Sequence, residues 1–326
     1  MVAMLLSTNR AVEVLRAAGE STRMRILALL AREELAVLEI CRVLDQSQPR
    51  ISRHLKLLAE AGLVERFPDG AWVFYRLASG GETGDLIASI IRRIDPKDPV
   101  ILRDVEQLAA VWAERTAEAS EYFARNAARW DEIRSLYVAE SDVEAAILQA
   151  AGPGPYKRLV DLGSGTGRML RLLGPQAEHA LGLDLSQQML NIARTEVAEA
   201  GLKQVELRHG DIFGTGLPSQ SADVVVVHQV LHYLSDPAAA VREAARIVRE
   251  GGRLVIVDFA PHRLEFLREQ HQHRRLGFAE GEMARWLSAC GLSKVLLKDL
   301  PSTRSDGLTV RIWTAERGRE GHRSAA

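Results

Sequence analysis

The residues best placed to bind a ligand lie in one glycine-rich stretch, residues 158–184, which reads RLVDLGSGTGRMLRLLGPQAEHALGLD. A short apolar run ends in Asp161, a G-x-G-x-G turn follows, and a helical segment then leads to a second apolar run that ends in Asp184. Glycine allows the backbone to turn sharply and lets a ligand approach more closely than a Cβ atom would permit. Because a carboxylate two residues before the first glycine would repel a pyrophosphate, this turn favours a ligand that carries positive charge.

The stretch resembles motif I of class I methyltransferases that depend on S-adenosylmethionine (SAM), a ligand with an ammonium and a sulfonium group. The resemblance covers roughly residues 120–316 and continues in order through HGDIFGTGLP, ADVVVVHQVLHYLSDP and GGRLVIVDF. The alternative for the glycine turn alone is a tight turn with no ligand, and the later motifs disfavour it.

The resemblance implies a role for several of the matching residues. Asp184 would accept hydrogen bonds from the ribose hydroxyls, Asp211 would accept one from the adenine amino group, and Ile212 would lie against the adenine ring. The implied cofactor is SAM, or S-adenosylhomocysteine (SAH) as a ligand. The expected cofactor-binding residues are Asp161, Gly163, Ser164, Gly165, Gly167, Asp184, Leu185, Met189, Asp211, Ile212 and His228.

Residues for the chemical step are harder to assign than residues for binding. Methyl transfer from a sulfonium needs an in-line nucleophile about 3 Å from the methyl group, and a base where the nucleophile carries a proton. His228 and Gln229 end an apolar run and His232 follows one turn later, so we expect these side chains to line the acceptor side. His228 and His232 are the catalytic candidates. The alternative is that His228 only contacts the cofactor and that His232 is structural.

The chain lacks the motifs of enzymes that methylate DNA bases. VHQV stands where amino-group DNA methyltransferases carry Asn-Pro-Pro-aromatic, and the Pro-Cys nucleophile of cytosine-C5 enzymes is absent from the sequence. Arsenite methyltransferases use several cysteines, whereas this chain has two, Cys41 and Cys290. We therefore expect DNA to be bound but not methylated, and any methyl acceptor to be a small molecule that the sequence does not identify.

A separate unit is expected over residues 8–79. Two helical segments precede a pair of helices joined by DQS, a turn of the length that a helix-turn-helix needs. LVERF and WVFYRL then form two strand-like runs joined by PDG, which predicts a β-hairpin wing. This order of elements, together with the sequence QSQPRISRHLKLLAEAGLV followed by DGAWVFYRL, resembles the winged helix-turn-helix of ArsR-type bacterial repressors.

That resemblance implies that the helix beginning at Gln48 enters the major groove of a double-stranded DNA operator. Ile51, Leu55 and Leu58 fall on one face of the helix and leave polar side chains on another. The alternative is a polar face that merely faces water, and His54 alone is more often a solvated or packing histidine than a base contact. The expected DNA-binding residues are Gln48, Arg50, Ser52, Arg53, His54, Lys56 and Arg76.

No metal site is expected. ELAVLEI, residues 34–40, matches the segment in which arsenic sensors of the ArsR type carry a cysteine pair, but Ala36 and Leu38 occupy those positions. Cys41 alone cannot form a multidentate soft-metal site. The histidines of PHRLEFLREQHQHRRLGF are unevenly spaced and lack a cysteine partner, so we expect a solvated basic helix and lid there.

A helical region is expected over residues 83–120, interrupted at Asp95-Pro96 and Pro99. Its apolar stripe suits either the homodimer interface that the ArsR resemblance implies or packing against the second half of the chain, and we favour a two-fold dimer. Tyr122 lies in a segment that resembles the helical lead-in of small-molecule methyltransferases. It would help to close the cofactor pocket, or serve as a core aromatic.

Alternating apolar runs and helical segments with short loops predict an α/β fold, with a mostly parallel, Rossmann-like doubly wound sheet that binds its ligand at the carboxyl ends of the strands. Strands are expected near residues 157–162, 179–184, 204–208, 222–227, 253–258, 293–298 and 308–315. Helices are expected near residues 166–173, 186–200, 236–249 and 281–290. The expected domains are a winged helix-turn-helix at 1–95, a helical linker and lead-in at 96–135, a methyltransferase domain at 136–318 and a disordered tail at 319–326.

Composition sets the broad class. A chain of 326 residues with ordinary globular composition is long enough for two domains. Its formal net charge of -1 gives no overall attraction to DNA, so DNA binding must come from a local face. Few cysteines, no long apolar run and no signal-peptide pattern predict a cytoplasmic protein without a membrane segment.

Two functions of different class remain open. In the first, the protein is an ArsR-type repressor whose methyltransferase-like half senses SAM or SAH. Some ArsR-type relatives respond to methionine-cycle metabolites, which makes methionine or one-carbon genes the expected targets. In the second, it is a working small-molecule methyltransferase whose DNA-binding module regulates its own operon. A metal-responsive repressor is disfavoured because the cysteine pair is missing.

Overall fold

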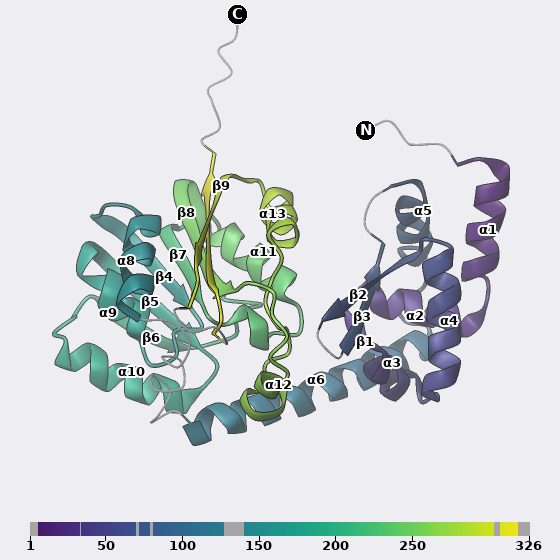
Figure 1. Cartoon of the computed structure of the whole chain (residues 1–326), viewed down its shortest axis with the longest axis horizontal. Helices are drawn as coiled ribbons and strands as arrows, with labels where there is room; N and C mark the ends of the chain where they lie inside the picture. The colour runs from purple at the N-terminus through teal and green to yellow at the C-terminus, as the bar shows by residue number, and fades with distance from the viewer. Residues whose placement is uncertain are drawn as a thin grey trace, which may run out of the picture. The chain divides into compact units, whose positions relative to one another are not determined.

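The computed structural model of the chain describes residues 6–32, 34–69, 72–78, 81–126, 140–302 and 307–318. The chain divides into two compact units, Met1–Ala117 and Glu118–Ala326. The division falls within one long helix, α6 (Pro99–Asn126) (Figure 1). None of the described helices is long and apolar enough to cross a membrane. The domain limits expected from the sequence at residues 95, 135 and 318 stay predictions.

The first unit contains the expected helix-turn-helix and wing. Its further helices are α1 (Thr8–Ala18), α2 (Ser21–Leu30), α3 (Val37–Leu44), α4 (Gln48–Glu60) and α5 (Gly81–Ile91). Its sheet has the order β1-β3-β2 and consists of β1 (Leu35–Ala36), β2 (Val64–Asp69) and β3 (Trp72–Leu77). Asp45 ends α3 in the left-handed conformation, with a φ of 52°, which turns the chain towards α4 within three residues. β2 and β3 pair antiparallel and form the wing.

The first half of α6 belongs to the core of this unit. Leu108 and Val111 are buried among the apolar side chains of the helix-turn-helix. Arg25 on α2 donates to both carboxylate oxygens of Asp104 on α6, at 2.7 and 2.6 Å, and Asp104 is buried. Paired in this way, a buried carboxylate fixes the register of α6 against α2.

The interruption expected in this helical region is confirmed. α5 ends at Ile91 and α6 begins at Pro99. Between them the Asp95 carboxylate accepts from the Lys97 N–H at 2.9 Å, and the N–H of Val100 donates to Asp98 at 2.8 Å, which caps α6. Tyr122 lies on α6, but its side chain is outside the described part of the structure, so the expectation for it remains untested.

A seven-stranded sheet forms the centre of the second unit, with the order β6-β5-β4-β7-β8-β10-β9. The strands are β4 (Tyr156–Leu162), β5 (Ala177–Asp184), β6 (Val205–His209), β7 (Ala222–His228), β8 (Val248–Phe259), β9 (Leu292–Leu300) and β10 (Val310–Arg317). All neighbours from β6 to β8 pair parallel, and β10 pairs antiparallel with β8 and β9. The expected mostly parallel α/β sheet is confirmed.

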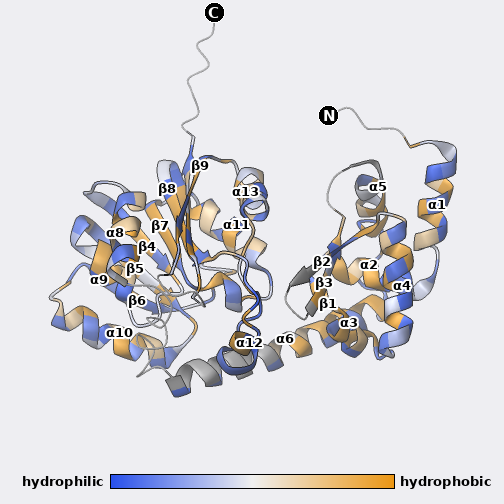
Figure 2. Cartoon of the chain, in the orientation of Figure 1, coloured by the Kyte–Doolittle hydropathy of each residue, from blue (hydrophilic) through white to orange (hydrophobic). Residues whose placement is uncertain are grey.

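Helices cover both faces of this sheet (Figure 1). One face packs against α8 (Glu140–Ala151), α9 (Arg168–Leu173) and α10 (Gln187–Glu199), and the other against α11 (Pro237–Ile247) and α13 (Glu280–Ala289). Successive valines of β7 alternate between the two cores, with Val224 and Val226 in one and Val225 and Val227 in the other. Figure 2 shows the central strands as largely hydrophobic, as a sheet buried on both sides requires.

Candidate cofactor edge and DNA-binding surface

The glycine turn lies at the carboxyl end of β4. Gly163, Gly165 and Gly167 have φ values of 75°, 51° and 82°, a region that other residues rarely adopt. The N–H of Gly163 donates to the carbonyl of Leu183 at 2.7 Å, which fastens the turn to β5. A Cβ atom at Gly163 would lie 2.4 Å from a methyl carbon of Val230, so only glycine fits there. The turn is therefore a rigid structure shared by β4, β5 and the segment after β7.

Three carboxylates lie at or just after the carboxyl ends of three adjacent strands. Asp161 is buried near the end of β4, with an exposed fraction of 1%. Asp184 ends β5 and accepts from the N–H groups of Gly165 and Ser186, both at 2.8 Å. Burial raises the pKa of the Asp184 carboxyl, and these two N–H donors act in the opposite direction. Asp211 follows β6 and is exposed. The resulting edge is acidic, as a cationic ligand requires.

The loops after β5 and β6 are joined to each other. The N–H of Gly210 donates to the carbonyl of Asp184 at 3.0 Å, and His209 Nε2 lies 2.9 Å from the carbonyl oxygen of Leu185. Asp211 accepts from the N–H of Phe213 at 2.9 Å, which folds the start of its loop back on itself. The two acids expected at the ribose and the adenine therefore stand on neighbouring, connected loops.

The remaining expected cofactor residues differ in exposure. Ser164, Met189, Ile212 and His228 are buried. Leu185 is 47% exposed, and Phe213, which sequence reasoning missed, is 39% exposed. Large apolar side chains beside the connected loops provide an apolar surface suited to a flat ring. The sequence offered one indication that Phe213 could contact a ligand, since it is an aromatic residue in a glycine-rich loop.

His232, which the sequence predicts on the acceptor side, forms a buried pair with Asp258. His232 lies in the short helix η3 (Leu231–Tyr233), and Asp258 lies near the end of β8. The distance from His232 Nδ1 to Asp258 Oδ1 is 2.8 Å, and the two residues are 1% and 0% exposed. Because a carboxylate only accepts, Nδ1 carries the proton and donates it. Sequence reasoning found His232 but missed Asp258, whose signal was an acid near the end of the neighbouring strand.

His273 adds a second imidazole to this region. Its ring centroid lies 4.1 Å from that of His232 and 5.8 Å from that of Phe259. The residue is 6% exposed, and burial lowers the pKa of its imidazole far below the ordinary value. The expectation of a solvated histidine cluster is therefore wrong for His273, because the backbone after α12 (Phe266–His271) folds it inward, with both Arg274 and Arg275 N–H groups donating to the His232 carbonyl.

The described residues contain no group of three or more His, Cys, Asp or Glu side chains that could hold a metal ion. Cys41 and Cys290 are half-buried free thiols, and burial raises the pKa of each. Raised pKa values keep both groups as thiols, whereas a metal ligand or nucleophile acts as the thiolate.

On α4 one face is buried and the other is open. Ile51, Leu55 and Leu58 are completely buried. The side chains of Gln48, Arg50, Ser52, Arg53 and Lys56 are exposed. Five of the seven expected DNA-binding residues thus lie on one accessible helix surface, within its first three turns.

His54 and Arg76, the other two, are engaged inside the unit. The His54 side chain is 14% exposed, with Nδ1 3.5 Å from a carboxylate oxygen of Glu20. Burial lowers the pKa of His54, and the Glu20 charge acts against that shift. Arg76 Nη2 lies 2.6 Å from Glu65 and Nη1 lies 3.4 Å from Glu34. Both carboxylates bind the Arg76 cation within the protein.

The wing offers another cation. Arg66 on β2 is exposed and faces Tyr75 across the hairpin. Within the described part of the chain it has no ion-pair partner, in contrast to Arg76. Arg66 could not be predicted as a DNA contact from the sequence. The alternation of side chains along one strand does not reveal which arginine pairs with an acid from another part of the chain.

Comparisons with known proteins match the two units separately. Residues 160–256 match a family model described as "Methyltransferase domain", and residues 20–66 match one described as "Bacterial regulatory protein, arsR family". These segments include the glycine turn with β4 to β8, and the helix-turn-helix with the start of the wing.

Three curated relatives show the same division. The uncharacterized methyltransferase YcgJ of Bacillus subtilis is 28% identical over 124 residues, which cover 38% of this chain and 49% of the relative. The arsenical resistance operon repressor of Escherichia coli is 46% identical over 68 residues, 21% of this chain and 58% of the relative. A demethylmenaquinone methyltransferase of Listeria monocytogenes is 37% identical over 90 residues, 28% of this chain and 38% of the relative. The chain thus spans between 38% and 58% of the length of these relatives. It contains a segment that matches the arsR-family model, followed by a segment that matches the methyltransferase-domain model.

Proposed function

We propose that this protein is a DNA-binding transcriptional regulator of the ArsR type whose second unit binds SAM or SAH, and whose affinity for DNA depends on that ligand. The observation that carries the proposal is the edge of the second unit, where a rigid glycine turn stands among Asp161, Asp184 and Asp211 on the ends of three adjacent strands. A surface of this composition suits a cationic nucleoside better than a phosphate.

The residues present fit SAM in three respects. A Cβ at Gly163 would meet Val230, so only glycine keeps the sharp turn that would let a ligand approach the backbone closely. Each Asp184 oxygen accepts one backbone N–H and keeps capacity for a ribose hydroxyl. The Ser164 Oγ is buried and, among the described residues, has no hydrogen-bond partner. Asp161 would attract the ammonium and sulfonium, and Asp211 with Ile212 would hold the adenine.

The DNA-binding role is supported by the open face of α4. Gln48, Arg50, Ser52, Arg53 and Lys56 would meet bases and phosphates of a double-stranded operator. The exposed wing residue Arg66 would contact the phosphate backbone of the DNA. His54 and Arg76 enter this proposal as residues that shape the surface, since both contact acids of their own unit.

A two-fold homodimer is part of the proposal. Val12 and Leu15 on α1 are 40% and 51% exposed, and Val100 and Leu102 near the start of α6 are 49% and 46% exposed. Exposed apolar side chains favour a protein partner, and two copies would place two recognition helices about one DNA turn apart. Sedimentation of the purified protein tests this, and a single monomeric species at micromolar concentration would contradict it.

The test of the main function measures ligand binding and DNA binding in one preparation. Calorimetry with SAM and with SAH should give saturable heat. DNA selected from a pool of random duplexes should then bind with an affinity that changes at least about fivefold when either ligand is added. A ligand shifts only an equilibrium in which it prefers one state. Unchanged DNA affinity at saturating SAM and SAH would remove the sensing role.

A second function, methyl transfer to a small molecule, is favoured by the His232–Asp258 pair. Bound SAM would supply an electrophilic methyl group. Asp258 holds His232 with Nδ1 protonated, which leaves Nε2 as the basic atom that could take a proton from a hydroxyl or amine acceptor. His228, buried at the end of β7, is the other residue proposed for this side.

Radiolabelled methyl transfer to panels of hydroxyl and amine metabolites tests this second function, with Asp161→Ala as the variant that should lose activity. If turnover is found, Asp258→Asn should lower kcat more than it raises KM, because the histidine would lose its orientation and its stabilised imidazolium. Tight SAM binding with no transfer to any acceptor would favour the sensing role instead.

A further inference from the structure

The loop between β6 and β7, residues 210–221, contains no helix or strand, so its shape depends on short-range bonds within it and on bonds to the elements around it. It begins with the proposed adenine contacts Asp211 and Ile212. One anchor is at its start, where the N–H of Gly210 donates to the carbonyl of Asp184. The other is at Thr215, whose carbonyl accepts from Arg208 on β6 at 2.7 Å.

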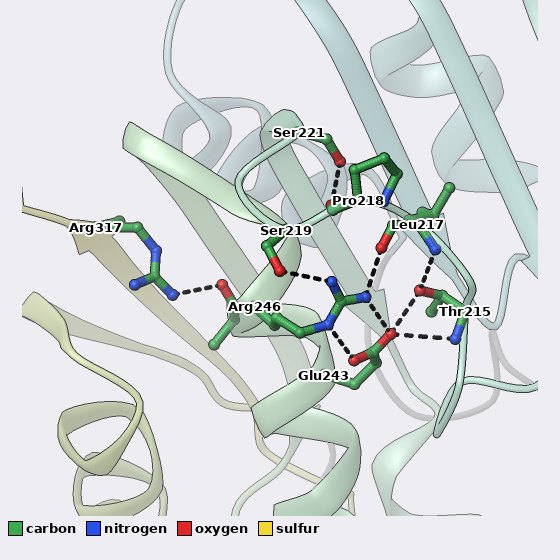
Figure 3. A network of polar contacts seen from close by, with 9 residues as sticks. Thr215, Leu217, Pro218, Ser219, Ser221, Glu243, Arg246 and Arg317 are labelled. Carbon is green, nitrogen blue, oxygen red and sulfur yellow. Dashed lines mark hydrogen bonds and ion pairs between the residues drawn. The ribbon is translucent and has the colours of Figure 1, made fainter.

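Two side chains of α11 complete the second anchor (Figure 3). One Glu243 oxygen accepts from both the N–H and the hydroxyl of Thr215, at 3.1 and 2.6 Å. Arg246 donates to both oxygens of Glu243 at 2.7 Å, and also to the Leu217 carbonyl at 2.7 Å and the Ser219 hydroxyl at 2.9 Å. Every functional atom of this pair is therefore bonded either within the pair or to the loop.

The Glu243–Arg246 pair should stay ionised and hydrogen-bonded. Thr215 is 5% exposed and the Glu243 side chain is 13% exposed. Hydrogen bonding from the Arg246 guanidinium holds the pKa of Glu243 at about 2, with further lowering from Thr215 and opposition from burial. Glu243 thus remains ionised and Arg246 remains paired across the physiological range, which keeps the bonds charge-assisted.

We propose that Glu243 and Arg246 are positioning residues for base recognition: by holding Thr215 to α11, they fix Asp211 and Ile212 in the arrangement that distinguishes adenine from other purines. This rests on the proposed SAM site. Four residues separate the two anchors, so the segment that contains the adenine contacts is held at both ends. Weakening the anchor at one end lets these residues sample more conformations, and ligand binding must then order them again.

The predicted consequence is a loss of base selectivity, which a general loss of stability would not produce. The probes are SAH and its 6-deamino analogue, in which unsubstituted purine replaces adenine. The wild-type protein should prefer SAH by about tenfold, because the analogue leaves the Asp211 carboxylate without the amino donor.

Thr215→Val removes the hydroxyl that bonds Glu243 and accepts from the Leu217 N–H, while keeping a similar shape. It should reduce the ratio of the two dissociation constants from about ten towards one. Thr215→Ser restores the hydroxyl and should restore the ratio. Glu243→Gln removes the charge that pairs with Arg246 and so weakens their hydrogen bonds. It should give a ratio of dissociation constants between those of the wild type and Thr215→Val. Thermal unfolding of each variant verifies that the protein is folded.

Arg249→Ala is the matched control. It removes another arginine–carboxylate pair, in which Arg249 donates to Asp223 at 2.7 Å at the start of β7, the opposite end from the cofactor edge. It should leave the ratio unchanged. No heat from the wild type with SAH would overturn the proposed cofactor itself. SAH binding with a wild-type ratio near one would overturn the proposed contact between Asp211 and the adenine amino group, and the positioning role with it. SAH binding with a tenfold wild-type ratio that Thr215→Val leaves intact would overturn the positioning role alone.

Discussion

On α4 the proposed contact residues come from one continuous stretch of helix, Gln48 to Lys56, whose buried face is completed by residues three and four positions apart. At the cofactor edge they come from the ends of β4, β5 and β6, and the turn and loops that carry them are bonded to groups far along the chain. One surface depends on local periodicity and the other on tertiary contacts. Changes on α4 should therefore act residue by residue, whereas changes at the edge should act through neighbours.

The largest effect is expected for the double substitution Arg50→Ala with Arg53→Ala. Both side chains are exposed on the open face of α4. Losing two DNA contacts should lower the affinity for selected duplex DNA by about a hundredfold or more. Fluorescence anisotropy measures it, and calorimetry with SAH should show an unchanged ligand affinity. A matching loss of SAH affinity would mean that the change is not confined to one surface.

At the other surface, Asp161→Ala should lower the affinity for SAM by roughly ten- to a hundredfold, because the site loses a buried charge that attracts the ligand cation. The loss should be smaller for SAH, which lacks the sulfonium charge. Calorimetry with both ligands measures the difference. Equal losses for both would contradict a role for this carboxylate at the sulfonium and would assign it to the shared ammonium.

On the wing, Arg66 and Arg76 can be compared, because Arg66 has no ion-pair partner among the described residues and Arg76 has two. Arg66→Ala should weaken DNA binding several-fold and reduce the slope of log affinity against log salt by about one. Arg76→Ala should leave that slope nearly unchanged, since Glu65 and Glu34 already neutralise the guanidinium. A reversed order of the two slopes would show that DNA displaces these carboxylates.

The smallest effect concerns Glu243, whose pKa falls from an ordinary 4.5 to about 2 in the folded protein. The contribution of ionised Glu243 to the free energy of unfolding is complete above about pH 4.5. It is lost as the pH falls towards 2, because Glu243 in the unfolded chain takes up its proton at a higher pH than in the folded protein. Urea unfolding between pH 5 and pH 2.5 should show Glu243→Gln less stable at the upper end, by roughly 1 kcal/mol, and the gap should close at the lower end. A constant gap would mean that the charge of Glu243 contributes nothing.

The parts of the fold that sequence reasoning located are those set by neighbours in the chain. Each of the expected strands and helices of the second unit overlaps an observed element, because apolar period and turn residues are local signals. The open and buried faces of α4 follow from the same periodicity. The glycines with positive φ at the turn after β4 could also be predicted from the local sequence, without knowledge of distant residues.

The parts that sequence reasoning missed depend on long-range contacts. Arg76 meets Glu34, 42 positions away, and His54 meets Glu20, the N-cap residue of α2. Asp258 reaches His232 across 26 positions, and His273 is buried by a loop that folds back on η3. Types and spacing identify these residues as polar, but only the packing of separate elements decides which of them face solvent.

The buried pair of Arg25 and Asp104 has a consequence for dissecting the chain. Because Asp104, Leu108 and Val111 complete the core of the helix-turn-helix, α6 is not an exchangeable spacer. A fragment cut at residue 95 would leave Arg25 without its acid and the adjoining apolar surface open to water, and should aggregate or melt early, whereas a fragment ending at Ala117 retains these partners. Any transplant of this DNA-binding unit onto another protein must therefore take the first half of that helix with it.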